Sequence, residues 1–123
     1  MTSERKCLQS IRPLIRTVLS TNKEDKQTAI EKLWDAFERL RSYHIDKNKR
    51  ESTEQIISVI SHGDDMYNKL FSDGFFALTK IGNDFRIRHC EMDRKDIIDE
   101  NYYDYLFKRC FSLIELSLQC LKK

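Results

Sequence analysis

Apolar side chains recur every three or four residues along most of this chain. The clearest stripe lies between about Thr21 and Tyr43. Its members are Ile30, Leu33, Trp34, Phe37 and Leu40. This spacing places side chains on one face of an α-helix, so it predicts a helix with one buried face. Thr21 followed by Glu24 has the spacing of a capping box, which indicates where this helix begins.

Weaker forms of the pattern lie on either side of this helix. Residues 3–19 predict a helix that Pro13 kinks or delays, because proline lacks a backbone N–H. Ser52 and Gln55 form a second capping box, and the apolar residues up to Ile60 predict a short helix after it.

Two more helices are predicted in the C-terminal half. The run His62-Gly63-Asp64 is typical of a helix stop followed by a new N-cap, and the next helix reaches Gly82. Its apolar residues are Met66, Leu70, Phe71, Phe75, Leu78 and Ile81. The last helix runs from Asp99 or Glu100 to Leu121, and it has too many apolar residues for one stripe. Such a helix is either central to a bundle or shared with a second subunit.

These patterns predict an all-α fold, a bundle of four main helices plus a short one, without a sheet. The chain has only 3 Gly and 1 Pro in 123 residues, and so few helix breakers favour long helices joined by short loops. Its length and the absence of a linker predict a single domain that spans 1–123.

Charge and cysteine usage narrow the function classes. The net charge of +2, from 22 basic and 20 acidic residues, does not by itself indicate nucleic-acid binding. The densest basic cluster, 47–50, is diluted by neighbouring acidic residues and is expected to be a solvated loop. The 4 cysteines form no C-x-x-C pair, so no structural zinc site is expected.

Several other classes have no support in the sequence. No signal peptide or run of about 20 apolar residues is present, so we expect a cytoplasmic protein that does not enter a membrane. Glycine-rich phosphate loops, H-E-x-x-H motifs and G-x-S-x-G elbows are also missing, which argues against kinases, metalloproteases and serine hydrolases.

The densest candidate chemistry lies between the last two predicted helices. Arg86 and Arg88 alternate with Phe85 and Ile87, so both arginines project together if the segment is extended and the apolar residues face the core. Arginine can hold a phosphate and stabilise charge in a transition state. His89, beside them, can exchange protons with a ribose 2′-hydroxyl or a leaving oxygen. This scheme needs no metal and no cofactor.

Two alternatives stay open for this segment. The arginines can instead form surface ion pairs with Asp84, Glu91 and Asp93, which contribute little to stability. The run 89–91 (His-Cys-Glu) contains metal ligands, but no second cluster completes a site. Near the start of the last helix, three tyrosines are expected to fill the core and rim of the bundle, although they could also stack on bases. They are Tyr102, Tyr103 and Tyr105.

Three segments together resemble bacterial HEPN-like domains, including those of abortive-infection proteins. They are 31–40 (EKLWDAFERL), 75–89 (FFALTKIGNDFRIRH) and 105–110 (YLFKRC), so the resemblance covers most of the chain. It implies a bundle of four or five helices, commonly dimeric, with an Arg/His motif before the final helix. Many members are metal-independent ribonucleases in toxin–antitoxin or anti-phage systems, and others are non-catalytic helper or binding domains. Members often form the C-terminal part of longer proteins, and 1–123 could be such a part.

The Arg/His motif departs from the family pattern, in which four to six residues separate the arginine from the histidine. Only two residues separate Arg86 from His89, and Arg88 precedes His89 directly. The resemblance therefore leaves two functions open. One is an endoribonuclease in which Arg88 and His89 are catalytic, Arg86 and Asn83 bind the substrate RNA, and a second subunit supplies the missing histidine. The other is a non-catalytic interaction domain that partners an antitoxin or a fused effector.

The apolar pattern of the last helix also predicts a homodimer. Phe107, Phe111 and Leu118 lie away from the main apolar line of that helix and would be exposed in a monomer. Their burial against a second copy, with a contribution from the preceding helix, would stabilise the dimer by roughly 1.5–3 kcal/mol per side chain.

Overall fold

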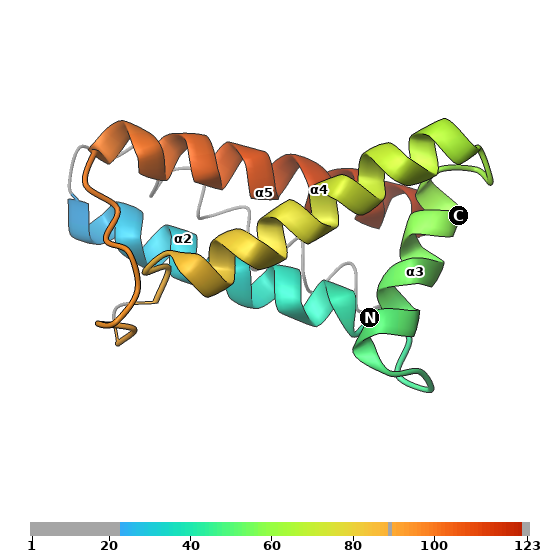
Figure 1. The fold of residues 1–123 in the computed structure, drawn as a ribbon, viewed down its shortest axis with the longest axis horizontal. Coiled ribbons are helices and arrows are strands. Elements are labelled where there is room, and N and C mark those ends of the chain that lie inside the picture. Colours follow the sequence, from blue (N-terminus) through green and yellow to red (C-terminus); the bar gives the residue numbers. More distant parts are fainter. Residues whose placement is uncertain (1–22, 89, 122–123) are drawn as a thin grey trace.

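Four helices account for most of the part of the chain that the structure, a computed structural model, describes, which is residues 23–88 and 90–121 (Figure 1). These helices are α2 (Lys23–Arg41), α3 (Lys49–Ile60), α4 (Asp65–Asp84) and α5 (Glu100–Leu121). The described residues contain no strand, only an isolated bridge between Phe85 and Lys95. The all-α prediction is therefore confirmed. The predicted helix 3–19, with Pro13, and the capping residue Thr21 lie outside the described residues.

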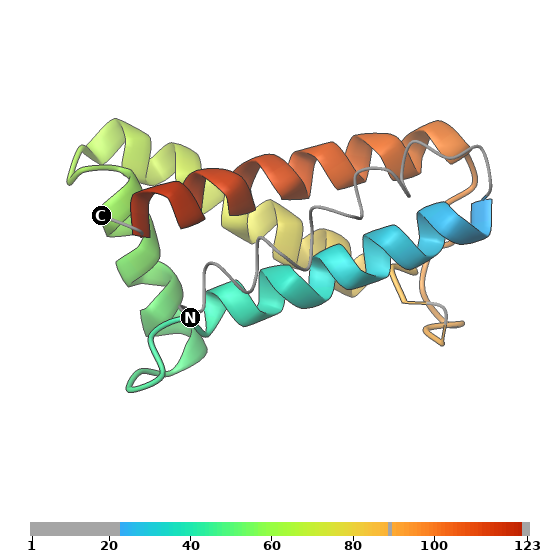
Figure 2. The same cartoon turned by 180° about the vertical axis from the view of Figure 1, so that it is seen from behind.

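The helices form a bundle that α3 crosses at one end. α2 and α5 run side by side in the same direction, and α4 returns antiparallel to them (Figures 1 and 2). The contact between α2 and α5 is the most extensive in the bundle. Segment 85–99, which joins α4 to α5, lies at the end opposite α3. In the described part of the chain, no helix combines the length and apolarity needed to cross a membrane.

The boundary between α3 and α4 follows the prediction. His62 and Gly63 adopt positive φ angles of 54° and 75°, which end α3 in a tight turn. Asp64 then caps α4, because its Oδ1 accepts the backbone N–H groups of Met66 (2.9 Å) and Tyr67 (3.1 Å).

The predicted start of α3 is wrong, because Asn48 and not Ser52 is the N-cap. Asn48 Oδ1 accepts the backbone N–H of Glu51 at 2.8 Å, and Asn48 Nδ2 donates to Glu51 Oε1 at 2.6 Å. The helix therefore begins at Lys49 and includes part of the predicted loop. Ser52 is buried inside it, and its hydroxyl accepts the backbone N–H of His44 at 3.0 Å. This bond ties the helix to the preceding loop.

The core is built around α2. Its predicted stripe is fully buried, with exposed fractions of 0–3%. The ring of Phe37 stacks on that of Phe75 in α4, with centroids 5.7 Å apart. The Trp34 indole is 1% exposed, and its Nε1 donates to the backbone oxygen of Leu78 in α4 at 3.2 Å. Lys26 completes the contacts of α2 with an ion pair to Asp104 of α5 at 2.9 Å.

Gly82 of α4 lies directly against the Trp34 side chain of α2. A Cβ at this position would lie 2.9 Å from Trp34 Nε1 and 3.0 Å from Trp34 Cδ1, both closer than van der Waals contact allows. Gly74 in the same helix is less constrained, since a Cβ there would meet only Leu113 Cδ2 at 3.7 Å. The absence of a side chain at Gly82 therefore lets α4 pack on the indole.

The burial of α4 and α5 corrects two expectations, that Phe107 and Leu118 would be exposed in a monomer and that the apolar residues of α4 face the core. Phe107 (2% exposed) and Leu118 (1%) are buried within the chain, so their burial does not require a second copy. Cys110 is also fully buried. α5 carries several apolar faces because it packs against α2, α3 and α4 at once. By contrast, Met66 (84% exposed) and Leu70 (58%) of the apolar pattern of α4 lie on the surface.

A pair of glycine substitutions tests the packing of Trp34. We expect Gly82→Ala to lower the free energy of unfolding by about 1–3 kcal/mol, because the new methyl group overpacks the indole. Gly74→Ala is the matched control in the same helix, and we expect it to stabilise by roughly 0.5–1 kcal/mol because alanine has the higher helix propensity. Urea denaturation measures both changes. Equal stabilisation by the two alanines would contradict the close contact.

Candidate functional site

The segment after α4 is held against the end of that helix. Phe85 leaves the helix in an extended conformation, with φ −108° and ψ 155°. The backbone N–H of Arg86 then donates to Lys95 O at 2.8 Å, and that of Lys95 donates to Asp84 O at 3.0 Å. Residues 84–86 and Lys95 therefore close the loop that contains the predicted site.

Arg94 fixes the same loop by capping α4. Its Nη1 donates to the backbone oxygens of Gly82 (3.1 Å) and Asn83 (2.6 Å), and it lies 3.5 Å from Glu91 Oε2. A cation at this position satisfies free carbonyl groups and interacts favourably with the helix dipole. Arg94 was not predicted to have this role.

A partly buried chain of hydrogen bonds connects the loop to α2 and α5. Ile87 is fully buried, and its backbone oxygen accepts Gln27 Nε2 at 2.5 Å. Gln27 Oε1 in turn accepts the hydroxyl of Tyr103 at 2.8 Å. These two bonds fix the backbone between Arg86 and Arg88.

Arg88 is paired with a carboxylate of α2. Its Nη2 lies 2.8 Å from Asp35 Oδ1, and its backbone N–H donates to Glu91 Oε1 at 3.1 Å. Partial burial acts to lower the pKa of Arg88, but the hydrogen bond and the charge of Asp35 outweigh it, so the pKa is raised. The guanidinium is therefore held in one position and compensated by a neighbouring negative charge.

Arg86 lies in a different, mainly acidic hollow. The hollow has a volume of about 430 Å³ and is lined by Glu24, Gln27, Thr28, Glu31, Arg86, Asp96 and Tyr103. Three carboxylates against one guanidinium make this an unfavourable place for a phosphate. Burial raises the pKa of Tyr103, helped by Asp96 and opposed by Arg86. The structure thus places the two arginines against α2 at separate points, Arg88 at Asp35 and Arg86 in this hollow.

The other predicted site residues are less constrained. Asn83 is exposed in the last turn of α4. His89, the predicted acid–base group, lies outside the described residues. Cys90 is exposed. Within residues 23–88 and 90–121, no three His, Cys, Asp or Glu side chains gather into a group that could hold a metal ion.

Sequence reasoning missed the groups that hold this segment in place. Asp35 is 53 residues from Arg88 in the sequence, and Gln27 is 76 residues from Tyr103. Gln27 lies at the border of the apolar stripe of α2, where a helix meets polar groups of a covering segment, but Asp35 lies on the opposite side of the helix and carried no such signal.

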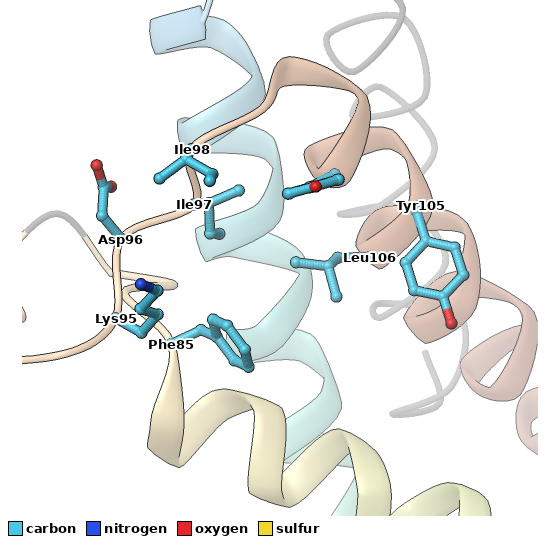
Figure 3. Close-up of a pocket in the computed structure, with 8 residues that line it drawn as sticks. Phe85, Lys95, Asp96, Ile97, Ile98, Tyr105 and Leu106 are labelled. Atoms are coloured by element: carbon cyan, nitrogen blue, oxygen red, sulfur yellow. The ribbon is translucent and has the colours of Figure 1, made fainter.

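An apolar groove beside the same loop was also missed. It has a volume of about 500 Å³ and lies between segment 95–98 and the first turns of α5 (Figure 3). The tyrosines at the start of α5 divide as predicted, since Tyr103 is fully buried while Tyr102 and Tyr105 form an exposed rim. The two exposed tyrosines line the groove.

No known protein-family model matches this chain, and neither a curated protein nor a solved structure matches it.

The raised pKa of Tyr103 predicts a pH dependence of stability. Below the ordinary tyrosine value of 10.0, the phenol is neutral in both states and its stabilising effect is complete. Above that value the unfolded chain loses this proton first, so the contribution falls as pH rises through the folded pKa. We expect the loss of stability between pH 8 and pH ~10.5 to be smaller in Tyr103→Phe than in the parent. Urea denaturation at the two pH values measures it.

Tyr105→Phe is the control for this experiment, because Tyr105 is exposed and its hydroxyl bonds only to Arg109 among the described residues. This variant should keep the pH dependence of the parent. The same pH dependence in Tyr103→Phe as in the parent would contradict the predicted role of the buried phenol.

Proposed function

We propose that this chain is a non-catalytic helical interaction domain that self-associates through α4. The observation that carries the proposal is an exposed apolar surface in the first half of α4. This surface consists of Met66 (84% exposed), Tyr67 (57%) and Leu70 (58%). Contiguous apolar side chains on a protein surface are typical of interaction sites.

The α4 surface continues into a hollow between α4 and α5. Leu70 lines this hollow of about 370 Å³ together with Phe71, Leu113 and Leu116. An ion pair between Lys69 and Asp73, 3.2 Å long, lies at the border of the surface. Apolar projections, a neighbouring apolar hollow and charges of both signs are the elements of a self-complementary interface around a two-fold axis.

The surroundings of Arg88 support the non-catalytic part of the proposal. An arginine that binds a phosphate needs donors that are not already compensated by a carboxylate. Arg88 is compensated by Asp35, and Arg86 lies among Glu24, Glu31 and Asp96. Binding of RNA at this position would separate an existing ion pair and bring phosphates close to several carboxylates.

Sedimentation velocity at micromolar concentration tests the self-association. We expect the parent chain to be a dimer and Leu70→Arg to be a monomer, because the substitution places a charge at the centre of the apolar surface. The variant should keep the helical circular dichroism spectrum of the parent, since Leu70 is largely exposed. Ile45→Arg is the matched control, as Ile45 is 95% exposed in the loop between α2 and α3. A parent chain that is monomeric throughout this range would refute the proposal.

A second candidate function is a metal-independent endoribonuclease in defence or toxin–antitoxin responses. The observation that favours it is the long-range bond from Arg88 to Asp35, which fixes a one-third exposed guanidinium next to position 89. A fixed cation beside a histidine is an arrangement that can position a phosphate for attack by the 2′-hydroxyl. In this function Arg88 and His89 are catalytic, and Arg86 and Asn83 contact the RNA.

Incubation with total RNA, with and without a chelator, separates the two functions. If the chain is a ribonuclease, we expect 2′,3′-cyclic phosphate products, and losses on the order of 10²–10⁴ in rate for His89→Ala and Arg88→Ala. His62→Ala is the control, because His62 lies exposed in the turn between α3 and α4. Since the non-catalytic function is our primary proposal, we expect no cleavage above that of a buffer blank. Cleavage that disappears in both site variants, with their melting temperatures unchanged, would reverse this preference.

A further inference from the structure

The apolar groove beside α5 shares only Asp96 with the hollow around Arg86 and no residue with the α4 surface. Its walls are Phe85, Ile97 and Ile98 on one side and Tyr102, Tyr105 and Leu106 on the other. In Figure 3, Phe85, Ile97, Ile98 and Leu106 gather around one space, and the Asp96 side chain points away from it. A volume of about 500 Å³ is in the range of sites that enclose a small molecule or a few peptide side chains.

One wall of the groove is a backbone segment with an open edge. The N–H and C=O of Lys95 bind residues 84–86, so these groups point toward that neighbouring segment. The backbone N–H and C=O groups of Asp96 and Ile98 take no part in this pairing. Both residues are exposed, whereas Ile97 between them is 2% exposed. Among the described residues, no hydrogen bond involves the backbone of Asp96 or Ile98.

An apolar groove beside unpaired backbone groups fits an extended peptide better than a simple apolar molecule. An apolar molecule would use the groove but leave the exposed N–H and C=O groups to water. An extended peptide can pair with these groups and place alternate side chains in the groove, which is strand addition to an open edge. A helix would fill the groove but would not satisfy the edge.

The charge at the groove also restricts the sequence of the peptide that fits it. Lys95 lines the groove and is exposed, and none of the ion pairs between described residues includes it. The opposite charge, on Asp96, points away from the apolar space (Figure 3). A carboxylate on the peptide beside its apolar side chain would therefore meet a cation without a competing partner.

We infer that the groove binds an extended segment of another protein, with an apolar side chain near an acidic residue, by strand addition along 95–98. This inference rests on the proposed function of the chain as an interaction domain. The groove contains none of the residues of the α4 surface. Loss of self-association in Leu70→Arg should therefore leave peptide binding unchanged, and failure of one proposal does not imply failure of the other.

A panel of labelled hexapeptides tests the inference. The probes alternate threonine with one varied apolar residue (valine, leucine, phenylalanine or tryptophan) and end in glutamate. Fluorescence anisotropy with the full chain measures affinity, and amide chemical-shift changes locate the site. We expect sub-millimolar binding of at least one probe, with shift changes at 95–98 and at the start of α5. If no probe binds at millimolar concentration, or if the shifts map to α4, the inference is wrong.

Backbone-modified probes separate strand addition from simple apolar binding. Methylation of alternate backbone nitrogens removes the hydrogen-bond donors of the peptide and keeps every side chain. We expect it to weaken binding by about tenfold or more. Equal affinity of the methylated and parent probes would overturn strand addition and leave only an apolar pocket.

Protein variants test the groove itself. Ile98→Asp should weaken binding by about tenfold, because it places a charge in the groove. It should still fold, since Ile98 is 72% exposed. Ile45→Asp, in the loop between α2 and α3, is the matched control and should bind as the parent does. Lys95→Glu should weaken binding of glutamate-ended probes by about threefold and favour lysine-ended probes. Unchanged affinities in Ile98→Asp and Lys95→Glu would overturn the assignment of this groove.

Discussion

The contact between Trp34 and the last turns of α4 is the constraint on which the rest of the structure depends. The indole is almost completely buried, donates to Leu78 O and occupies the space that a side chain at Gly82 would need. A buried Trp N–H without an acceptor would be costly, so this bond fixes where α4 ends relative to α2. The direction in which the chain leaves α4 follows from it, and so does the position of Arg88 next to Asp35, the neighbour of Trp34.

Around this contact, charged side chains of the connecting segment mainly hold backbone in place. Arg94 binds the carbonyl groups at the end of α4, and Glu91 binds the backbone N–H of Arg88. Arg88 itself reaches Asp35. The described contacts of this cluster of arginines and carboxylates are therefore those of a loop held to its scaffold.

Two apolar surfaces are exposed on the described part of the chain. α5 hides most of its apolar residues because it contacts three helices, while the first half of α4 extends beyond the core and exposes Met66 and Leu70. At the other end, segment 95–98 and the first turns of α5 leave a groove with an unpaired backbone edge. This distribution of exposed groups is the reason to prefer partner binding to RNA chemistry.

The sequence by itself determined the helical class, the stripe of α2, the boundary at 62–64 and the extent of α5, because periodicity and capping are local properties. Only the tertiary structure decided that Asn48 caps α3, that Phe107 and Leu118 are buried within one chain, and that Arg88 meets Asp35. The last two depend on groups that other helices bring close. The Asn48 cap is local, because it is made with Glu51 three residues later, and Ser52 is not the cap because its hydroxyl accepts the backbone N–H of His44. The spacing of residues along the chain contains no information about such distant neighbours. Which apolar side chains are buried and which remain exposed is decided by the packing of the helices against one another.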